Sequence, residues 1–233
     1  MCGICGVYGV EDKKLIKTMT QKLIHRGPDQ EGYYIDKKMM LGHRRLSIID
    51  LSNKGKQPMS NEDKTIWIVF NGEIYNFKEL RIDLEEKGHR FYSNTDSEVI
   101  VHGYEEYGVE FLQKLNGMFA FGIWDSKKKL LFLARDRVGV KPMYYYHGKE
   151  RFSFASEIKA IIADKNVPRE VNLEALNQYI GFEYVPAPLS MFKGIYKLKA
   201  GHYLIFKENK ISIHKYWDVQ SEPTKFNENE LIE

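Results

Sequence analysis

The chain opens Met1-Cys2-Gly3-Ile4-Cys5-Gly6, and the chemistry of its two cysteines decides how the rest of the sequence is interpreted. Three interpretations compete. The pair is a dithiol redox centre, or half of a zinc site, or Cys2 is a nucleophile that becomes the first residue once Met1 is removed. The sequence holds only these two cysteines, so no disulfide framework is indicated. The choice depends on residues further along the chain.

The redox and zinc interpretations find little support in the sequence. A thioredoxin-like pair follows a strand within a βαβ pattern, and only Met1 precedes Cys2. A structural zinc site needs four ligands, and the seven histidines show no His-x₃₋₅-His spacing. We therefore expect no metal site. Cys5 is expected to be a small core residue, and the same role stays an alternative for Cys2.

The nucleophile interpretation has a physical logic. Cys2 is small enough for an aminopeptidase to remove Met1 before it. The new α-amine would titrate near pH ~8 and the thiol near ~8.5, so one residue would hold both a nucleophile and its base. Such a site also requires an oxyanion hole and groups that hold a substrate.

The composition is that of an ordinary globular protein. Hydrophobic residues make up 43% and charged residues 29% of the 233 positions, and the net charge is +3. This balance gives no argument for nucleic acid or an anionic membrane as a partner. No stretch approaches the roughly 18 apolar residues of a membrane span, and the N-terminus lacks an apolar secretory segment. We expect a cytoplasmic protein.

Hydrophobic periodicity predicts short strands and amphipathic helices. Strands are expected at residues 3–9, 66–70, 117–124, 130–134, 142–147, 151–155, 201–206 and 211–216. Helices are expected at 12–24, 76–87, after Thr95-Asp96, at 156–163 and at 172–181. Asn71-Gly72 follows the strand at 66–70 and resembles a turn dipeptide. Hairpins dominate without βαβ alternation, which favours an α+β fold with antiparallel sheets covered by helices.

Several short motifs occur in a characteristic order. They are Cys2-Gly3-Ile4, His25-Arg26-Gly27-Pro28-Asp29, Gly42-His43-Arg44-Arg45-Leu46-Ser47-Ile48-Ile49-Asp50, Asn71-Gly72-Glu73-Ile74-Tyr75-Asn76, Arg135-Asp136-Arg137-Val138-Gly139-Val140-Lys141-Pro142 and Ser156-Glu157-Ile158-Lys159-Ala160. Together they resemble the glutaminase domain of glutamine-hydrolysing asparagine synthetases, which are class II glutamine amidotransferases. The resemblance covers essentially the whole chain. It implies an N-terminal nucleophile hydrolase fold, an αββα sandwich of two antiparallel sheets between helices.

The resemblance assigns catalytic roles to three residues. Cys2 would attack the side-chain amide of glutamine, with its own α-amine as base. The Asn71 side-chain amide and the Gly72 backbone N–H would form the oxyanion hole. Taken without its context, Asn71-Gly72 would more often be a hairpin turn.

The resemblance also assigns the groups that hold free L-glutamine. Arg45 would bind the α-carboxylate, and backbone groups near Ile49 would add hydrogen bonds. Glu73 and Asp96 would bind the α-ammonium, and Asn71 also belongs to the expected glutamine-binding residues. In isolation Arg45 would more often be a surface ion-pair residue, and Asp96 a helix N-cap. Arg26, Asp29, Arg135 and Asp136 are expected to be structural, and His25 and His43 to be hydrogen-bonded histidines outside the chemistry.

The expected organisation is a glutamine amidotransferase domain over residues 1–217, followed at 218–233 by a linker to an ATP-dependent synthetase domain that this sequence lacks. Hydrolysis of glutamine is expected to need no cofactor; ATP and Mg²⁺ belong only to that synthetase domain. The expected partners are L-glutamine, the synthetase domain and a second copy in a homodimer. Purine-precursor and glucosamine-phosphate amidotransferases fit the motifs less well. If Met1 is retained, the alternative is a non-catalytic glutamine-binding or assembly module.

Overall fold

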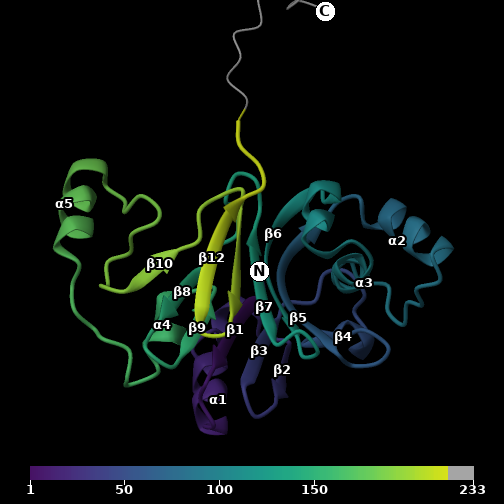
Figure 1. Ribbon diagram of the computed structural model, residues 1–233, viewed down its shortest axis with the longest axis horizontal. Coiled ribbons are helices and arrows are strands. Elements are labelled where there is room, and N and C mark those ends of the chain that lie inside the picture. Colours follow the sequence, from purple (N-terminus) through teal and green to yellow (C-terminus); the bar gives the residue numbers. More distant parts are fainter. Residues whose placement is uncertain (220–233) are drawn as a thin grey trace, which may run out of the picture.

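The structure is a computed structural model that describes residues 1–219, and two antiparallel sheets form its centre (Figure 1). The first sheet has the strand order β10 (Ile195–Lys197), β8 (Tyr144–His147), β9 (Phe152–Ala155), β1 (Gly3–Tyr8), β3 (Met39–Arg45) and β2 (Gln30–Ile35). The second has the order β12 (Lys210–Lys215), β11 (His202–Lys207), β7 (Leu130–Arg135), β6 (Gly117–Asp125), β5 (Ile66–Ile74) and β4 (Met59–Ser60).

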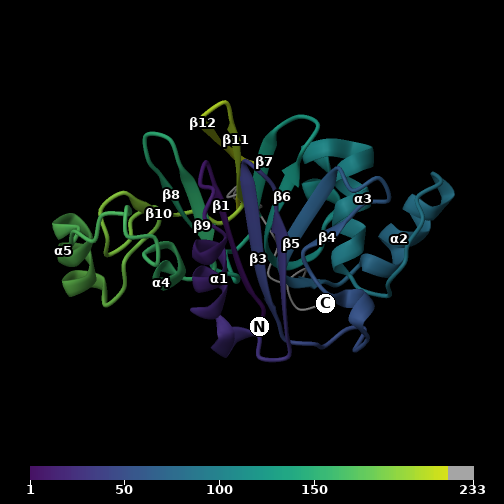
Figure 2. The ribbon, with the colours of Figure 1, turned by 90° about the horizontal axis from the view of Figure 1, so that it is seen from below.

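Helices cover the outer face of each sheet, as the two views show (Figures 1 and 2). On the first sheet they are α1 (Lys13–Gln21), η1 (Ile24–Arg26) and α4 (Ile158–Ile161). On the second they are α2 (Phe77–Glu86), α3 (Ser97–Tyr107) and η3 (Gly108–Lys114). The short turn η2 (Asn53–Gly55) precedes β4, and α5 (Leu173–Phe182) stands apart from the two sheets (Figure 1).

Three buried clusters correspond to the three interfaces between these layers. The cluster between the sheets includes Ile4, Val69, Leu133 and Phe154. The other two clusters lie between a sheet and its helices, one including residues of α1 and β1, the other residues of α3 and β5. The layers are therefore helix, sheet, sheet, helix, and the expected α+β sandwich is confirmed.

Alternation along β1 positions the N-terminus. Ile4 faces the second sheet, while its neighbour Cys5 faces the helices, because successive side chains of a strand point to opposite faces. A Cβ atom on Gly3 would lie 2.7 Å from Cβ of Leu23, so the glycine allows a close approach. Cys2 is thereby placed at the start of β1, and the N-terminus lies between the sheets (Figure 1).

The expected turn at Asn71-Gly72 is wrong. Both residues lie inside β5, paired with Ala120 and Phe119 of β6. A Cβ atom on Gly72 would lie 2.3 Å from the Met118 carbonyl oxygen. The glycine is needed because a neighbouring strand passes close to it, and the chain does not reverse there.

Strands β2, β3, β4 and β10 were not expected from the periodicity. Every residue of β3 is buried, including Arg44 and Arg45, so the usual apolar pattern is absent. Arg44 is neutralised locally, since its Nε donates to the Gly27 carbonyl (2.9 Å) and its Nη1 to Glu31 (2.8 Å). The sequence analysis did not predict this strand because it contains charged residues, which can be buried only with such partners.

Two further expectations concern the ends of the chain and membranes. The expected linker at 218–233 lies, apart from its first two residues, outside the described residues, and the boundary at 217 stays a prediction. Among residues 1–219, none of the helices has both the length and the apolar character required to cross a bilayer.

Candidate active site

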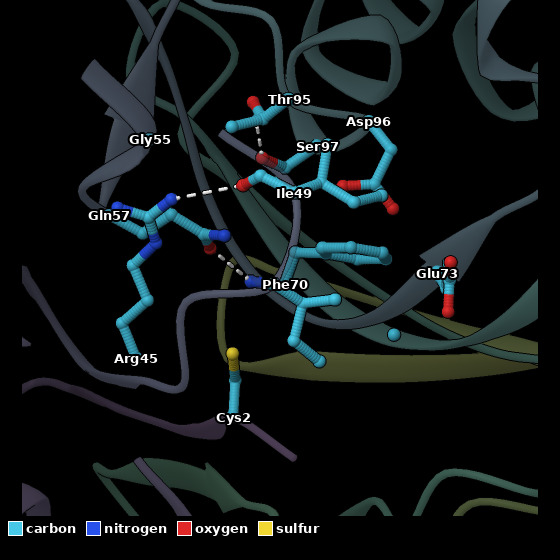
Figure 3. A pocket seen from close by; sticks show the side chains of 12 residues that line it. Cys2, Arg45, Ile49, Gly55, Gln57, Phe70, Glu73, Thr95, Asp96 and Ser97 are labelled. Atoms are coloured by element: carbon cyan, nitrogen blue, oxygen red, sulfur yellow. Dashed lines mark hydrogen bonds between the residues drawn. The ribbon is translucent and has the colours of Figure 1, made fainter. Parts of the chain in front are cut away.

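One pocket brings together most of the residues expected to hold glutamine (Figure 3). It lies where the start of β1, the segment after β3, the end of β5 and the start of α3 meet. Its lining residues are Cys2, Arg45, Ile48, Ile49, Gly55, Gln57, Phe70, Gly72, Glu73, Thr95, Asp96 and Ser97. Of the expected site residues, only Asn71 does not line this pocket.

Cys2 is half-buried at one end of the pocket (Figure 3). Burial raises the pKa of its thiol, and a contact from Sγ to the Leu46 carbonyl oxygen (3.7 Å) and the nearby positive charges offset this only in part. The thiol is therefore protonated near neutral pH, and reaction as a thiolate requires a base. The Cys2 carbonyl accepts a hydrogen bond from Arg26 Nε (2.9 Å), which fixes the backbone at this point.

Asn71 and Gly72 are adjacent on β5 but face opposite sides of the sheet. Asn71 is two residues beyond Val69 of the inter-sheet cluster, so its side chain points toward the first sheet, where Cys2 precedes β1. Its side chain is 1% exposed, and neither amide atom has a hydrogen-bond partner within residues 1–219. A buried amide without partners is uncommon and is suited to receive a ligand atom.

Arg45 is buried beside the pocket, and protein oxygens hold its guanidinium. Nη1 donates to Gln30 Oε1 (2.9 Å) and the Ser52 carbonyl (2.8 Å). Nη2 donates to the carbonyls of Ile49 (3.2 Å) and Asp50. The charge is thus directed at the pocket wall, and a carboxylate would have to replace some of these backbone contacts to form a bidentate pair.

Asp96 and Glu73 lie together at the end of the pocket away from Cys2 (Figure 3). Asp96 occupies the N-cap position of α3 but makes no side-chain capping bond; its Oδ2 accepts from the Ile74 N–H (2.9 Å). Burial, with a smaller contribution from the Glu73 charge, raises the pKa of Asp96 to about 6. The two carboxyl groups form an acidic end suited to an ammonium group.

The sequence analysis missed five residues of the pocket wall. Gln57 is 5% exposed, and its Oε1 accepts from the Phe70 N–H (2.7 Å). Ser97 donates to Thr95 Oγ1 (2.9 Å), which places two hydroxyls beside Asp96. A Cβ atom on Gly55 would lie 2.1 Å from Arg45 Nη2. Thr95 and Ser97 flank Asp96, and Phe70 belongs to the expected strand at 66–70, so their positions next to expected residues were the available signal. Gly55 and Gln57 come from the segment between β3 and β4, whose course the sequence did not reveal.

The residues expected to be structural make contacts within the protein. Arg26 Nη1 pairs with Glu157 (3.0 Å), and Asp29 accepts from the Ser47 N–H (2.7 Å). Arg135 donates to three backbone carbonyls, and Asp136 accepts three backbone N–H groups. Burial lowers the pKa of His43 to about 4, so this histidine is neutral near pH 7.

Comparison with known proteins identifies the family. A family model described as a glutamine amidotransferase domain matches residues 1–217. The chain is 41% identical over 240 residues to asparagine synthetase [glutamine-hydrolyzing] 1 of Bacillus subtilis, covering all of this chain and 38% of that protein. It is 39% identical over 230 residues to asparagine synthetase [glutamine-hydrolyzing] 3 of the same organism, with 95% and 37% covered.

A solved structure shows the same fold. The glutamine phosphoribosylpyrophosphate amidotransferase of B. subtilis matches with a TM-score of 0.67 at 19% identity, covering 93% of this chain and 49% of that one. The chain spans less than two-fifths of the length of the two curated relatives. Its two-sheet sandwich is the fold of that amidotransferase. The chain therefore belongs to the family of class II glutamine amidotransferase domains, which are enzyme domains.

Proposed function

We propose that this domain hydrolyses free L-glutamine to glutamate and ammonia through a thioester on Cys2. The observation that carries the proposal is the pocket itself, with a thiol at one end and two carboxyl groups at the other (Figure 3). Glutamine has a reactive amide at one end and an α-ammonium at the other. The order of groups in the pocket matches the order of groups in this substrate.

In the proposed reaction, Sγ of Cys2 attacks the side-chain carbonyl carbon of glutamine and the Cys2 α-amine takes the thiol proton. The oxyanion that forms accepts hydrogen bonds from the Asn71 amide and the Gly72 N–H. Collapse breaks the C–N bond, and the departing nitrogen takes the proton back to leave as ammonia. Water then attacks the thioester, releasing glutamate and restoring the thiol.

The proposed selection of glutamine depends on charged side chains that line a partly buried pocket. Asp96 and Glu73 would pair with the α-ammonium, and Arg45, with the backbone near Ile49, would bind the α-carboxylate. In a peptide both α-groups are amides, so these charged partners would be left unpaired. We therefore propose selectivity for free glutamine over glutamine within a peptide.

The base in this scheme exists only after Met1 is removed. With Met1 in place the Cys2 nitrogen is an amide, and Met1 Sδ lies 3.9 Å from Arg26 Nη2. An unprocessed chain would bind glutamine without hydrolysing it, which is the non-catalytic alternative. Since burial raises the pKa of the Cys2 thiol, catalysis without a base is disfavoured.

The whole protein's activity is a further proposal. The relatives are named as glutamine-hydrolysing asparagine synthetases and extend well beyond the matched region. We propose that the ammonia serves ATP- and Mg²⁺-dependent asparagine synthesis in an attached domain. Helix α5 supports contact with such a domain, because Leu173, Ile180 and Phe182 are 62–74% exposed. The homodimer and the cytoplasmic location stay predictions.

The direct test is a glutaminase assay on the chain with Met1 removed. Glutamate and ammonia should appear in equal amounts without ATP, and Cys2→Ala should abolish both. A glutamine-containing peptide with blocked termini should not be hydrolysed. Absence of turnover in a chain whose mass confirms a free Cys2 amine would refute the proposal.

A further inference from the structure

A second cluster of reactive side chains lies apart from the glutamine pocket and shares no residue with it. It combines Glu62, between β4 and β5, His89, between α2 and α3, and His102 on α3. Each residue offers one ligating atom, and these three atoms lie within 4.8 Å of one another. The three segments are distant in the sequence and meet on the helix-covered side of the second sheet (Figure 1).

His102 is the unusual member of this cluster. Its side chain is 1% exposed, and neither ring nitrogen has a hydrogen-bond partner in the described part of the chain. Nδ1 lies 3.7 Å from Glu62 Oε2 and 4.0 Å from Glu105 Oε2. These separations are too long for hydrogen bonds. They are close to the spacing of about 3.4 Å between two ligands that each lie about 2.1 Å from a tetrahedral zinc ion.

His89 lies close to the same carboxylates. Its ring centroid lies 5.1 Å from that of His102, and its Nδ1 lies 3.9 Å from Glu105 Oε2. Glu105 Oε2 thus lies about equally far from Nδ1 of both imidazoles. The side chains of His89 and Glu105 are 12% and 34% exposed, so an ion would reach the cluster from solvent.

The other ring nitrogen of His102 faces a buried carboxylate. Nε2 lies 3.6 Å from Glu98 Oε1, and Glu98 is fully buried, accepting from the backbone N–H groups of Tyr92 and Ser93 (2.8 Å each). A metal on Nδ1 requires the proton on Nε2, where it would point at Glu98. This carboxylate–histidine–metal arrangement typically orients histidine ligands.

We propose that His89, His102 and Glu62 bind a divalent transition-metal ion, with Glu105 or water as the fourth ligand. Two imidazoles with carboxylates suit Zn²⁺, whereas Mg²⁺ and Ca²⁺ favour oxygen ligands alone. The ion would tie the segment before β5 and the segment before α3 to the helix that begins next to Asp96. The role is structural, since none of these residues lines the glutamine pocket. The sequence indicated no metal because this set lacks a short ligand spacing.

The test measures Zn²⁺ binding to the chelator-stripped full chain in a Cys2→Ser background, so that the Cys2 thiol does not compete. Competition with a chromogenic chelator should give one ion per chain. His89→Ala and Glu62→Gln should each weaken binding more than tenfold, and Zn²⁺ should raise the melting temperature of the parent but not of His89→Ala. His214→Ala is the matched control, because His214 is exposed on β12 and outside the cluster.

His89→Ala and Glu62→Gln change partly exposed side chains, and circular dichroism would verify that both variants fold. Co²⁺ in place of Zn²⁺ should give the intense visible bands of a four-coordinate site, and His89→Ala should lose them. The proposal is overturned if the parent binds no stoichiometric ion, or if His89→Ala and His214→Ala bind Zn²⁺ equally. Failure of glutamine hydrolysis would not affect this result.

Discussion

Replacing Asp96 by Asn should stabilise the protein while it weakens glutamine binding. Burial raises the pKa of Asp96 from 3.8 to about 6 in the folded state. A shift of about two units corresponds to about 3 kcal/mol by which folding disfavours the charged carboxylate at pH 7. Asn is neutral and keeps an oxygen that accepts from the Ile74 N–H, a bond of 2.9 Å in the wild type. The variant should therefore gain up to about 3 kcal/mol in free energy of unfolding at pH 7.

The pH dependence of this gain follows from the direction of the shift. Because the pKa of Asp96 is higher in the folded state, the folded protein binds more protons than the unfolded chain between about pH 4 and 6. The wild-type penalty is absent below about pH 4, grows through that window and is complete above about pH 6. Urea unfolding of both proteins at pH 4, 5, 6 and 7 should show their difference rise from near zero to its maximum.

Glutamine binding should change in the opposite direction. Loss of a charged hydrogen-bond partner costs about 1.5–3 kcal/mol, or roughly a 10- to 150-fold weaker affinity, measured in a Cys2→Ser background that prevents turnover. Affinity with Asp96 present should fall about tenfold from pH 7 to pH 5, and the Asn variant should lack this dependence. An Asn variant no more stable at pH 7, or one that binds glutamine normally, would refute the reasoning.

Three further substitutions test the roles of Asn71, Cys5 and Gly72. Asn71→Ala should lower kcat by about 10²–10³ with a small change in KM, because the Asn71 amide would act on the oxyanion. A rise in KM with kcat unchanged would contradict this. Cys5→Ser should hydrolyse glutamine at near wild-type rate, because Cys5 is fully buried and its pKa is raised to about 12 by burial; loss of turnover in the folded variant would favour a paired-cysteine role. Gly72→Ala should destabilise the protein, because its Cβ would lie 2.3 Å from the Met118 carbonyl oxygen. Gly181→Ala on α5 is the matched control, with no atom within 4 Å of its Cβ and an expected gain of up to about 1 kcal/mol.

The elements that could be predicted are those with a clear apolar period. The strand at 117–124 and the hairpin to 130–134 correspond to β6 and β7, because their side chains are buried on both faces of the second sheet. Strand β3 escaped prediction because its arginines and histidine are buried with partners from other elements. Asn71-Gly72 has the local chemistry of a turn, and tertiary pairing with β6 overrides it.

The candidate site, like the fold, could be predicted only in part. The family resemblance assigned Cys2, Arg45, Glu73 and Asp96, and the structure brings all four to one pocket. The sequence motifs do not show that backbone carbonyls hold the Arg45 guanidinium, because those contacts depend on the course of the loop after β3. The cluster around His102 escaped notice for a related reason. Its members come from three separate segments, and only folding brings them within ligand distance.

The most direct test of the central claim is the intact mass of the purified chain before and after reaction with an electrophilic glutamine analogue. The account predicts that Met1 is absent, that one adduct forms, that the adduct maps to Cys2 and that excess glutamine blocks it. Retention of Met1 with no labelling, or an adduct on Cys5, would contradict the assignment of Cys2 as an N-terminal nucleophile.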